Sequence, residues 1–99
     1  MKYRIVSLAA EDLAGAVKYY EDQSVGLGND FLDEFEAAVD RICQCPEAWR
    51  KVSHNHRRNL LRRFPYAVLY YYDGNEIIVS GVMNLRMDPE RQKQRLERM

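Results

Sequence analysis

The chain is poor in the residues that usually mark cross-linked or metal-bound folds. Its 99 residues include two cysteines, three prolines, five glycines and one tryptophan. Cys43 and Cys45 are two positions apart, and this spacing suits neither an ordinary disulfide nor a zinc site. His54-Asn55-His56 spells part of a metal-nuclease motif, but the further ligands that such a site needs do not accompany it. We therefore expect reduced cysteines at a helix end, no metal and no other cofactor.

Long apolar runs are missing as well. No stretch approaches the roughly 20 residues that a membrane helix needs, and residues 1–6 are too short and too soon polar for a signal peptide. The chain has no repeat, no glycine-rich phosphate loop and no Ser-His-Asp or Cys-His arrangement. We expect one cytoplasmic domain, residues 1–99, with no membrane partner.

Net charge is zero, but the two halves of the chain differ in sign. Residues 1–49 carry four Lys or Arg against ten Asp or Glu, a formal charge of −6. Residues 50–99 carry eleven against five, a formal charge of +6. Such asymmetry arises when two solvated faces carry opposite charges that merely balance. It also arises when a basic surface for an anionic partner is carried by helices whose other side is acidic.

Hydrophobic periodicity predicts an α+β fold of order β-α-α-β-β-β-α, with a helical hairpin packed on one face of a small antiparallel sheet. The charged segment 88–99 is predicted to form a last helix that is loose without a partner. The predicted elements are a strand near 3–6, helices over 8–23 and from 29 or 30 to 45, strands over 57–63, 66–72 and 76–83, and a helix over 89–98.

The second helix has the clearest amphipathic pattern. One stripe is apolar and should face the sheet, while the polar positions should face water. The apolar stripe is Leu27, Phe31, Phe35, Ala38, Val39 and Ile42, and the polar positions are Asp33, Glu34, Glu36, Asp40 and Arg41.

Arginines and tyrosines gather in the second half of the chain. Arginine offers a planar fork of donors for phosphate or carboxylate, and tyrosine offers stacking area with a polar tip. Alternatively, the arginines are edge-strand charges that discourage aggregation, and a tyrosine stripe at alternate positions is more often core. The predicted partner-binding residues are Arg57, Arg58, Arg62, Arg63, Tyr66, Tyr70 and Arg86.

Five segments together resemble the RelE/ParE superfamily of bacterial toxins, and the ParE-like branch most closely. The combination of these segments is specific, although each alone is a weak signal. They are Ala14-Gly15-Ala16-Val17-Lys18-Tyr19-Tyr20-Glu21, the stretch from Gly26-Leu27-Gly28 to Glu34, Pro46-Glu47-Ala48-Trp49, the stretch from Arg63-Phe64-Pro65-Tyr66 to Tyr70, and Asn84-Leu85-Arg86-Met87-Asp88-Pro89.

This resemblance implies the toxin of a type II toxin–antitoxin system, of the plasmid-stabilisation kind, that forms a hetero-oligomer with a cognate antitoxin. ParE-like members bind DNA gyrase, and RelE-like members cleave messenger RNA on the ribosome. Many relatives have His-x-Arg-Arg-Asp-Pro after the last strand, whereas this chain has Asn84, Arg86 and Met87. No Tyr or His follows Arg86, so the gyrase-binding function is favoured.

Two alternatives stay open. One is an mRNA endoribonuclease in which Arg58, Arg63 and Arg86 stabilise the transition-state charge as the catalytic candidates. The other is a degenerate, non-toxic binding protein. The missing Tyr or His after Arg86 favours a protein that is not an enzyme, and if it is one, an mRNA endoribonuclease is expected.

Overall fold

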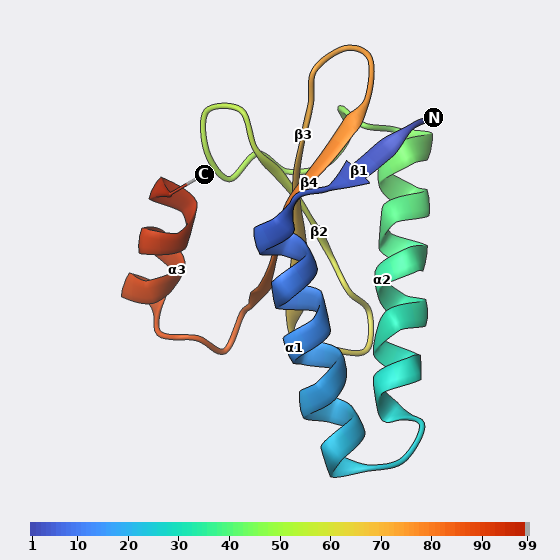
Figure 1. Ribbon diagram of the computed structural model, residues 1–99. Coiled ribbons are helices and arrows are strands. Elements are labelled where there is room, and N and C mark those ends of the chain that lie inside the picture. The colour runs from blue at the N-terminus through green and yellow to red at the C-terminus, as the bar shows by residue number, and fades with distance from the viewer. Residues whose placement is uncertain (99) are drawn as a thin grey trace.

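The computed structural model describes residues 1–98, which form a helical hairpin, a sheet and a C-terminal helix (Figure 1). The α+β class and the order of elements are confirmed. No helix in the described residues has the length and apolar character that crossing a membrane requires. The elements are β1 (Tyr3–Ile5), α1 (Ser7–Gln23), α2 (Leu27–Gln44), β2 (Arg57–Leu60), β3 (Tyr66–Tyr72), β4 (Ile77–Asn84) and α3 (Pro89–Glu97).

The four strands form one sheet in the order β1-β4-β3-β2. β2 and β4 are antiparallel to β3, but β1 is parallel to β4, with Tyr3 opposite Ile77. The sheet is therefore mixed, and the expectation of a wholly antiparallel sheet was wrong in this respect. The helical hairpin separates β1 from the other strands, and the hydrophobic pattern of so short a strand does not reveal its partner.

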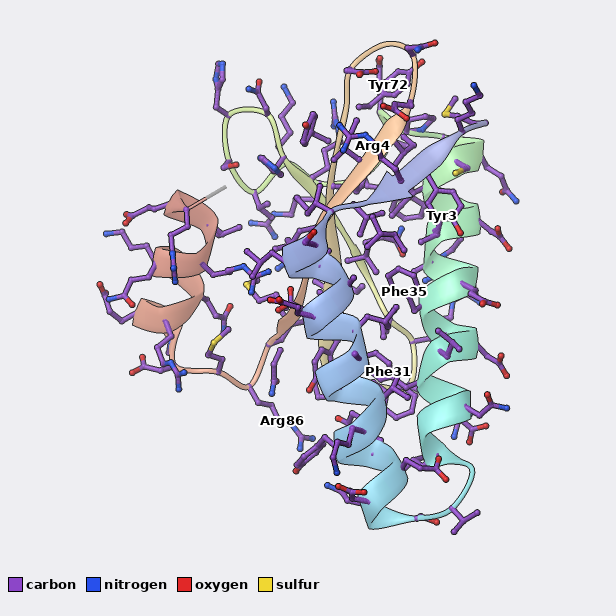
Figure 2. All side chains as sticks on the ribbon, viewed as in Figure 1. Tyr3, Arg4, Phe31, Phe35, Tyr72 and Arg86 are labelled. Carbon is purple, nitrogen blue, oxygen red and sulfur yellow. The ribbon has the colours of Figure 1, made fainter. Side chains whose placement is uncertain are left out.

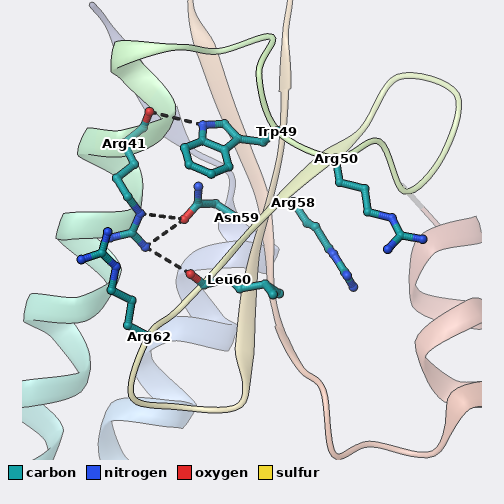
Figure 3. Close-up of a pocket in the computed structure, with 7 residues that line it drawn as sticks. All are labelled: Arg41, Trp49, Arg50, Arg58, Asn59, Leu60 and Arg62. Carbon is teal, nitrogen blue, oxygen red and sulfur yellow. Dashed lines mark hydrogen bonds between the residues drawn. The ribbon is translucent and has the colours of Figure 1, made fainter.

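The helical hairpin covers one face of the sheet, and α3 lies on the side away from α2 (Figures 1 and 3). The predicted apolar stripe of α2 is confirmed, because five of its six residues are buried: Phe31, Phe35, Ala38, Val39 and Ile42. Aromatic rings join the hairpin to β3. The Phe31 ring lies 4.9 Å from the Tyr66 ring and 5.0 Å from the Phe64 ring, both edge to face, a favourable geometry for aromatic pairs.

The turn between α1 and α2 is capped differently from the sequence-based expectation. Gly26 has φ 90° and immediately precedes α2, so neither Asn29 nor Asp30 is the N-cap residue. Instead, the Glu21 carboxylate accepts hydrogen bonds from the backbone N–H groups of Gly26 and Gly28, at 3.0–3.1 Å. A carboxylate at this place also interacts favourably with the α2 dipole. Glu21 therefore couples the end of α1 to the beginning of α2.

Gly28 marks the closest approach of the two helices. A Cβ atom added there would lie 2.7 Å from the Val17 carbonyl oxygen, whereas one added at Gly15 would meet nothing within 4 Å. We expect Gly28→Ala to lower the free energy of unfolding by about 1–3 kcal/mol through overpacking. Gly15→Ala should raise it by about 0.5–1 kcal/mol, because alanine favours the helix interior. Urea denaturation of both variants measures this, and equal effects would contradict the close approach.

α3 is held to the body of the protein by polar contacts. Asp88 caps it as predicted, accepting from the Glu90 N–H at 3.0 Å. The Arg95 guanidinium forms a two-pronged ion pair with the Asp12 carboxylate on α1. Asp12 also accepts from the Val82 N–H of β4 at 2.9 Å. The pairing of β1 with β4 ends at Val79, so Asp12 bonds to a part of β4 that β1 does not reach. That residues 88–99 loosen without a partner stays a prediction.

Because Asp12 joins three elements, its removal should cost more than the loss of its cation partner. We expect Asp12→Ala to lower the free energy of unfolding by about 2–3 kcal/mol, since it leaves the Val82 N–H and Arg95 unpaired. Asp12→Asn keeps an acceptor for Val82, and Arg95→Gln removes only the ion pair, so each should cost about 1 kcal/mol. Chemical denaturation followed by circular dichroism gives these values, and identical losses in all three variants would contradict this role.

Candidate functional site: an arginine hollow at the edge of the sheet

A hollow of about 330 Å³ lies at the outer edge of β2, the edge strand next to α2 (Figure 3). We call it the arginine hollow. The Trp49 indole and the Leu60 side chain provide apolar surface, and Leu60 is 46% exposed. Its lining residues are Arg41, Trp49, Arg50, Arg58, Asn59, Leu60 and Arg62.

Arg41 fixes β2 against α2. Its guanidinium donates from Nε and Nη2 to the Asn59 Oδ1, at 3.2 and 2.9 Å, and from Nη2 to the Leu60 carbonyl at 3.1 Å. The Arg41 carbonyl in turn accepts from the Trp49 indole N–H at 3.3 Å. The expectation that Arg41 faces water was therefore wrong. A polar residue on the outer part of a helix lies within reach of a neighbouring strand, and the one-dimensional pattern does not contain that neighbour.

Glu34 was also expected to face water, but it forms hydrogen bonds with the loop after β2. Its carboxylate accepts from the backbone N–H groups of Arg62 and Arg63, at 2.9 and 3.1 Å. One helical turn earlier, Asp30 pairs with the Arg63 guanidinium at 3.5 Å. The loop after β2 is thus tied to α2, and the Arg63 side chain is directed to the beginning of that helix.

The three candidate catalytic arginines do not line one hollow. Arg58 lines the arginine hollow, Arg63 pairs with Asp30, and Arg86 is exposed on the segment after β4 (Figure 2). Arg57 has a structural contact, because its Nη1 donates to the Trp49 carbonyl at 2.8 Å. Of the predicted arginines, the structure brings only Arg58 and Arg62 together in the arginine hollow.

The two predicted tyrosines belong to the core. Tyr66 is 8% exposed, and Tyr70 is fully buried with its hydroxyl donating to the Pro46 carbonyl at 2.6 Å. Burial raises the pKa of Tyr66, and it raises the pKa of Tyr70 to about 12. Both phenols are neutral at ordinary pH. The core interpretation of the tyrosine stripe is the one that agrees with the structure.

The histidine-containing loop has a packing role. His56 is buried and its ring lies 5.2 Å from the Tyr71 ring, and desolvation lowers the pKa of the imidazole. Among residues 1–98, no three His, Cys, Asp or Glu side chains are grouped so that they could hold a metal ion. Both cysteines are free thiols, as expected.

Sequence reasoning missed three members of the hollow. Arg41 lies on α2, Trp49 precedes β2, and Asn59 looks like an ordinary strand residue. The available signal was the polar Asn59 at an inward-facing position of the strand, between Arg58 and Leu60. A buried amide usually has a specific hydrogen-bond partner.

The hollow has unbalanced charge. Within the described residues, the side chains of Arg50, Arg58 and Arg62 make no hydrogen bond or ion pair with the protein, and no carboxylate lines the hollow. Free guanidinium groups next to an indole are suited to holding an anionic group by charge-assisted hydrogen bonds. The chemistry of the site is therefore suited to an anionic ligand.

The fold and the site together define a small α+β protein with a helical hairpin on a four-stranded sheet and a basic hollow at one edge of that sheet. The model of the family "ParE toxin of type II toxin–antitoxin system, parDE" matches residues 3–89. The chain therefore belongs to the ParE toxin family.

A solved structure has the same fold. It is a chromosomal ParDE toxin–antitoxin system from P. aeruginosa, with a TM-score of 0.63 and 16% sequence identity. The match covers 87% of this chain and 97% of that chain. A search of curated protein sequences finds no match.

The buried phenol of Tyr70 should make stability depend on alkaline pH. Its pKa is about 12 in the folded protein and about 10 in the unfolded chain, so the folded state retains the proton longer. Stability should be complete below pH 10 and fall between about pH 10 and 12. Melting temperatures measured over this range test the prediction. Tyr70→Phe should lower stability at neutral pH and flatten the alkaline decline, and an unchanged decline would contradict it.

Proposed function

We propose that this protein is the toxin of a type II toxin–antitoxin pair and that, when free in the cytoplasm, it binds DNA gyrase. A cognate antitoxin would neutralise it in a hetero-oligomer. Membership of the ParE toxin family over residues 3–89 supports the toxin role. The chromosomal ParDE structure with the same fold is a toxin–antitoxin system, which agrees with an antitoxin partner.

The separation of the candidate catalytic arginines is the observation that favours binding over RNA cleavage. A ribonuclease needs guanidinium groups and a proton-transfer group around one phosphate. Here Arg63 is engaged by Asp30, and Arg86 lies outside the arginine hollow. Tyr66 and Tyr70 lie in the core with raised pKa values, so neither is placed to transfer a proton at the surface.

Two members of the predicted partner-binding set, Arg58 and Arg62, form the proposed contact with the target. Arg62 is exposed and Arg58 is half-buried, and both lack an intramolecular ion pair among the described residues. Arg57, Tyr66 and Tyr70 support this edge from within through their contacts with the protein itself. The surface available to the target is therefore the β2 edge with its arginine hollow.

A supercoiling assay with purified gyrase tests the target. We expect the chain to inhibit supercoiling, and co-expression of the antitoxin encoded beside it to restore both supercoiling and growth. Arg58→Gln should weaken inhibition, whereas Arg91→Gln on α3, which removes the same charge elsewhere, should not.

Other outcomes identify the alternatives. Unaltered supercoiling together with codon-phased cuts in cellular mRNA, seen by primer extension, would establish the endoribonuclease. Growth without arrest on over-expression would establish a non-toxic binding protein.

A further inference from the structure

The arginine hollow keeps an excess of positive charge that the protein itself does not neutralise. Four of its seven lining residues are arginines and none is acidic. Arg41 is engaged with β2, but the guanidinium groups of Arg50, Arg58 and Arg62 have no partner in the described part of the chain. Like charges gathered in a concave site repel one another and raise the local concentration of anions. An anionic ligand would relieve this repulsion.

A buried polar group provides a second, independent sign of a ligand. Asn59 is 2% exposed, and its Oδ1 accepts from Arg41, but its Nδ2 has no acceptor. Figure 3 shows this amide nitrogen directed toward Trp49. An unpaired buried donor is unfavourable and needs an explanation. An acceptor oxygen that enters the hollow beside Trp49 would complete the hydrogen bonds of Asn59.

The arginines approach the hollow from both sides of β2. Arg41 and Arg62 come from the side of α2, and Arg50 and Arg58 come from the side of α3 (Figure 3). Trp49 and Leu60 add apolar surface between them. This arrangement suits a ligand that carries negative charges at several points along its length and also has a flat or apolar part.

We propose that the arginine hollow binds the phosphates of a nucleic-acid backbone, with a sugar or base against Trp49. A nucleic acid combines a charge at each nucleotide with a flat base beside it, which matches arginines placed next to the Trp49 indole. Arginine forks bind phosphate in a two-pronged manner, and aromatic rings accept bases of any sequence. This inference extends the proposed function, and its biological role rests on that function, because the toxin would contact the DNA that gyrase holds.

Trp49 is the single tryptophan of the chain and therefore reports on the hollow directly. The full chain, separated from its antitoxin, is titrated with a short single-stranded DNA, the same sequence as a duplex, pyrophosphate and a polyglutamate peptide. We expect one of the DNA forms to change the Trp49 fluorescence. For a single strand, the logarithm of affinity should fall with that of salt concentration by about 0.7 for each phosphate contacted.

A pair of matched double variants locates the site. Arg58→Gln with Arg62→Gln should lower DNA affinity by about tenfold or more and reduce the salt slope by about 1.4. Arg91→Gln with Arg98→Gln removes the same charge from α3 and its C-cap residue and should leave both quantities unchanged. Neither pair removes a side-chain hydrogen bond or ion pair within the described residues, and melting curves verify the folding of each variant.

Four results would overturn the inference. The first is that the parent chain does not bind DNA, and the second is that the two double variants lose DNA affinity equally. The third is DNA binding that is seen by anisotropy but leaves the Trp49 fluorescence unchanged. The fourth is that polyglutamate or pyrophosphate binds as tightly as DNA. Polyglutamate binding would indicate an acidic protein segment, and pyrophosphate binding a site for a free phosphate group.

The supercoiling assay separates this inference from the proposed function. Failure of DNA binding while the chain still inhibits gyrase would remove the inference alone. DNA binding by a chain that leaves gyrase unaffected would remove the proposed target and keep the nucleic-acid site.

Discussion

The hydrogen bonds from Arg41 to β2 are the constraint on which the site depends. β2 has a single neighbouring strand in the sheet. Its outer edge is held near Arg57 and Arg58 by the preceding segment, through the Lys51–Arg57 bridge and the Arg58 N–H bond to the Arg50 carbonyl at 3.0 Å. Farther along β2, Arg41 holds this edge from α2 by bonding both the Asn59 side chain and the Leu60 carbonyl. The Arg41 guanidinium thereby fixes the edge of β2, and the Arg41 carbonyl accepts from the Trp49 indole N–H, so one residue of α2 contacts both sides of the hollow.

The acidic half of the chain organises the basic half rather than merely balancing it. The Glu34 carboxylate accepts hydrogen bonds from two backbone N–H groups of the loop after β2. The Asp12 carboxylate accepts from one backbone N–H of β4 and from the Arg95 guanidinium, and the Glu21 carboxylate caps α2. Charged hydrogen bonds of this kind are stronger than neutral ones. Several carboxylates thus satisfy backbone donors at turns and edges, while the guanidinium groups of Arg50, Arg58 and Arg62 have no hydrogen bond or ion pair within the described residues.

Much of the fold could be predicted from local patterns. The apolar stripe of α2, the span of β3 and the Asp88 cap follow from periodicity and capping chemistry. Strand partners could not be predicted in this way, because the parallel pairing of β1 with β4 joins residues more than 70 positions apart in sequence. For the site, the pattern predicted Arg58 and Arg62 but not their neighbours Arg41, Trp49 and Asn59.

The sequence by itself determined the class of fold, the family and the positive charge of the second half of the chain, because these depend on periodicity, short motifs and residue counts. Tertiary structure decided which arginines line one hollow and where the tyrosines lie. Each strand residue can point to either face, and only packing of the helical hairpin placed Tyr66 and Tyr70 inside and left Arg58 and Arg62 at the open edge. The contact energies that select one face arise between residues distant in sequence.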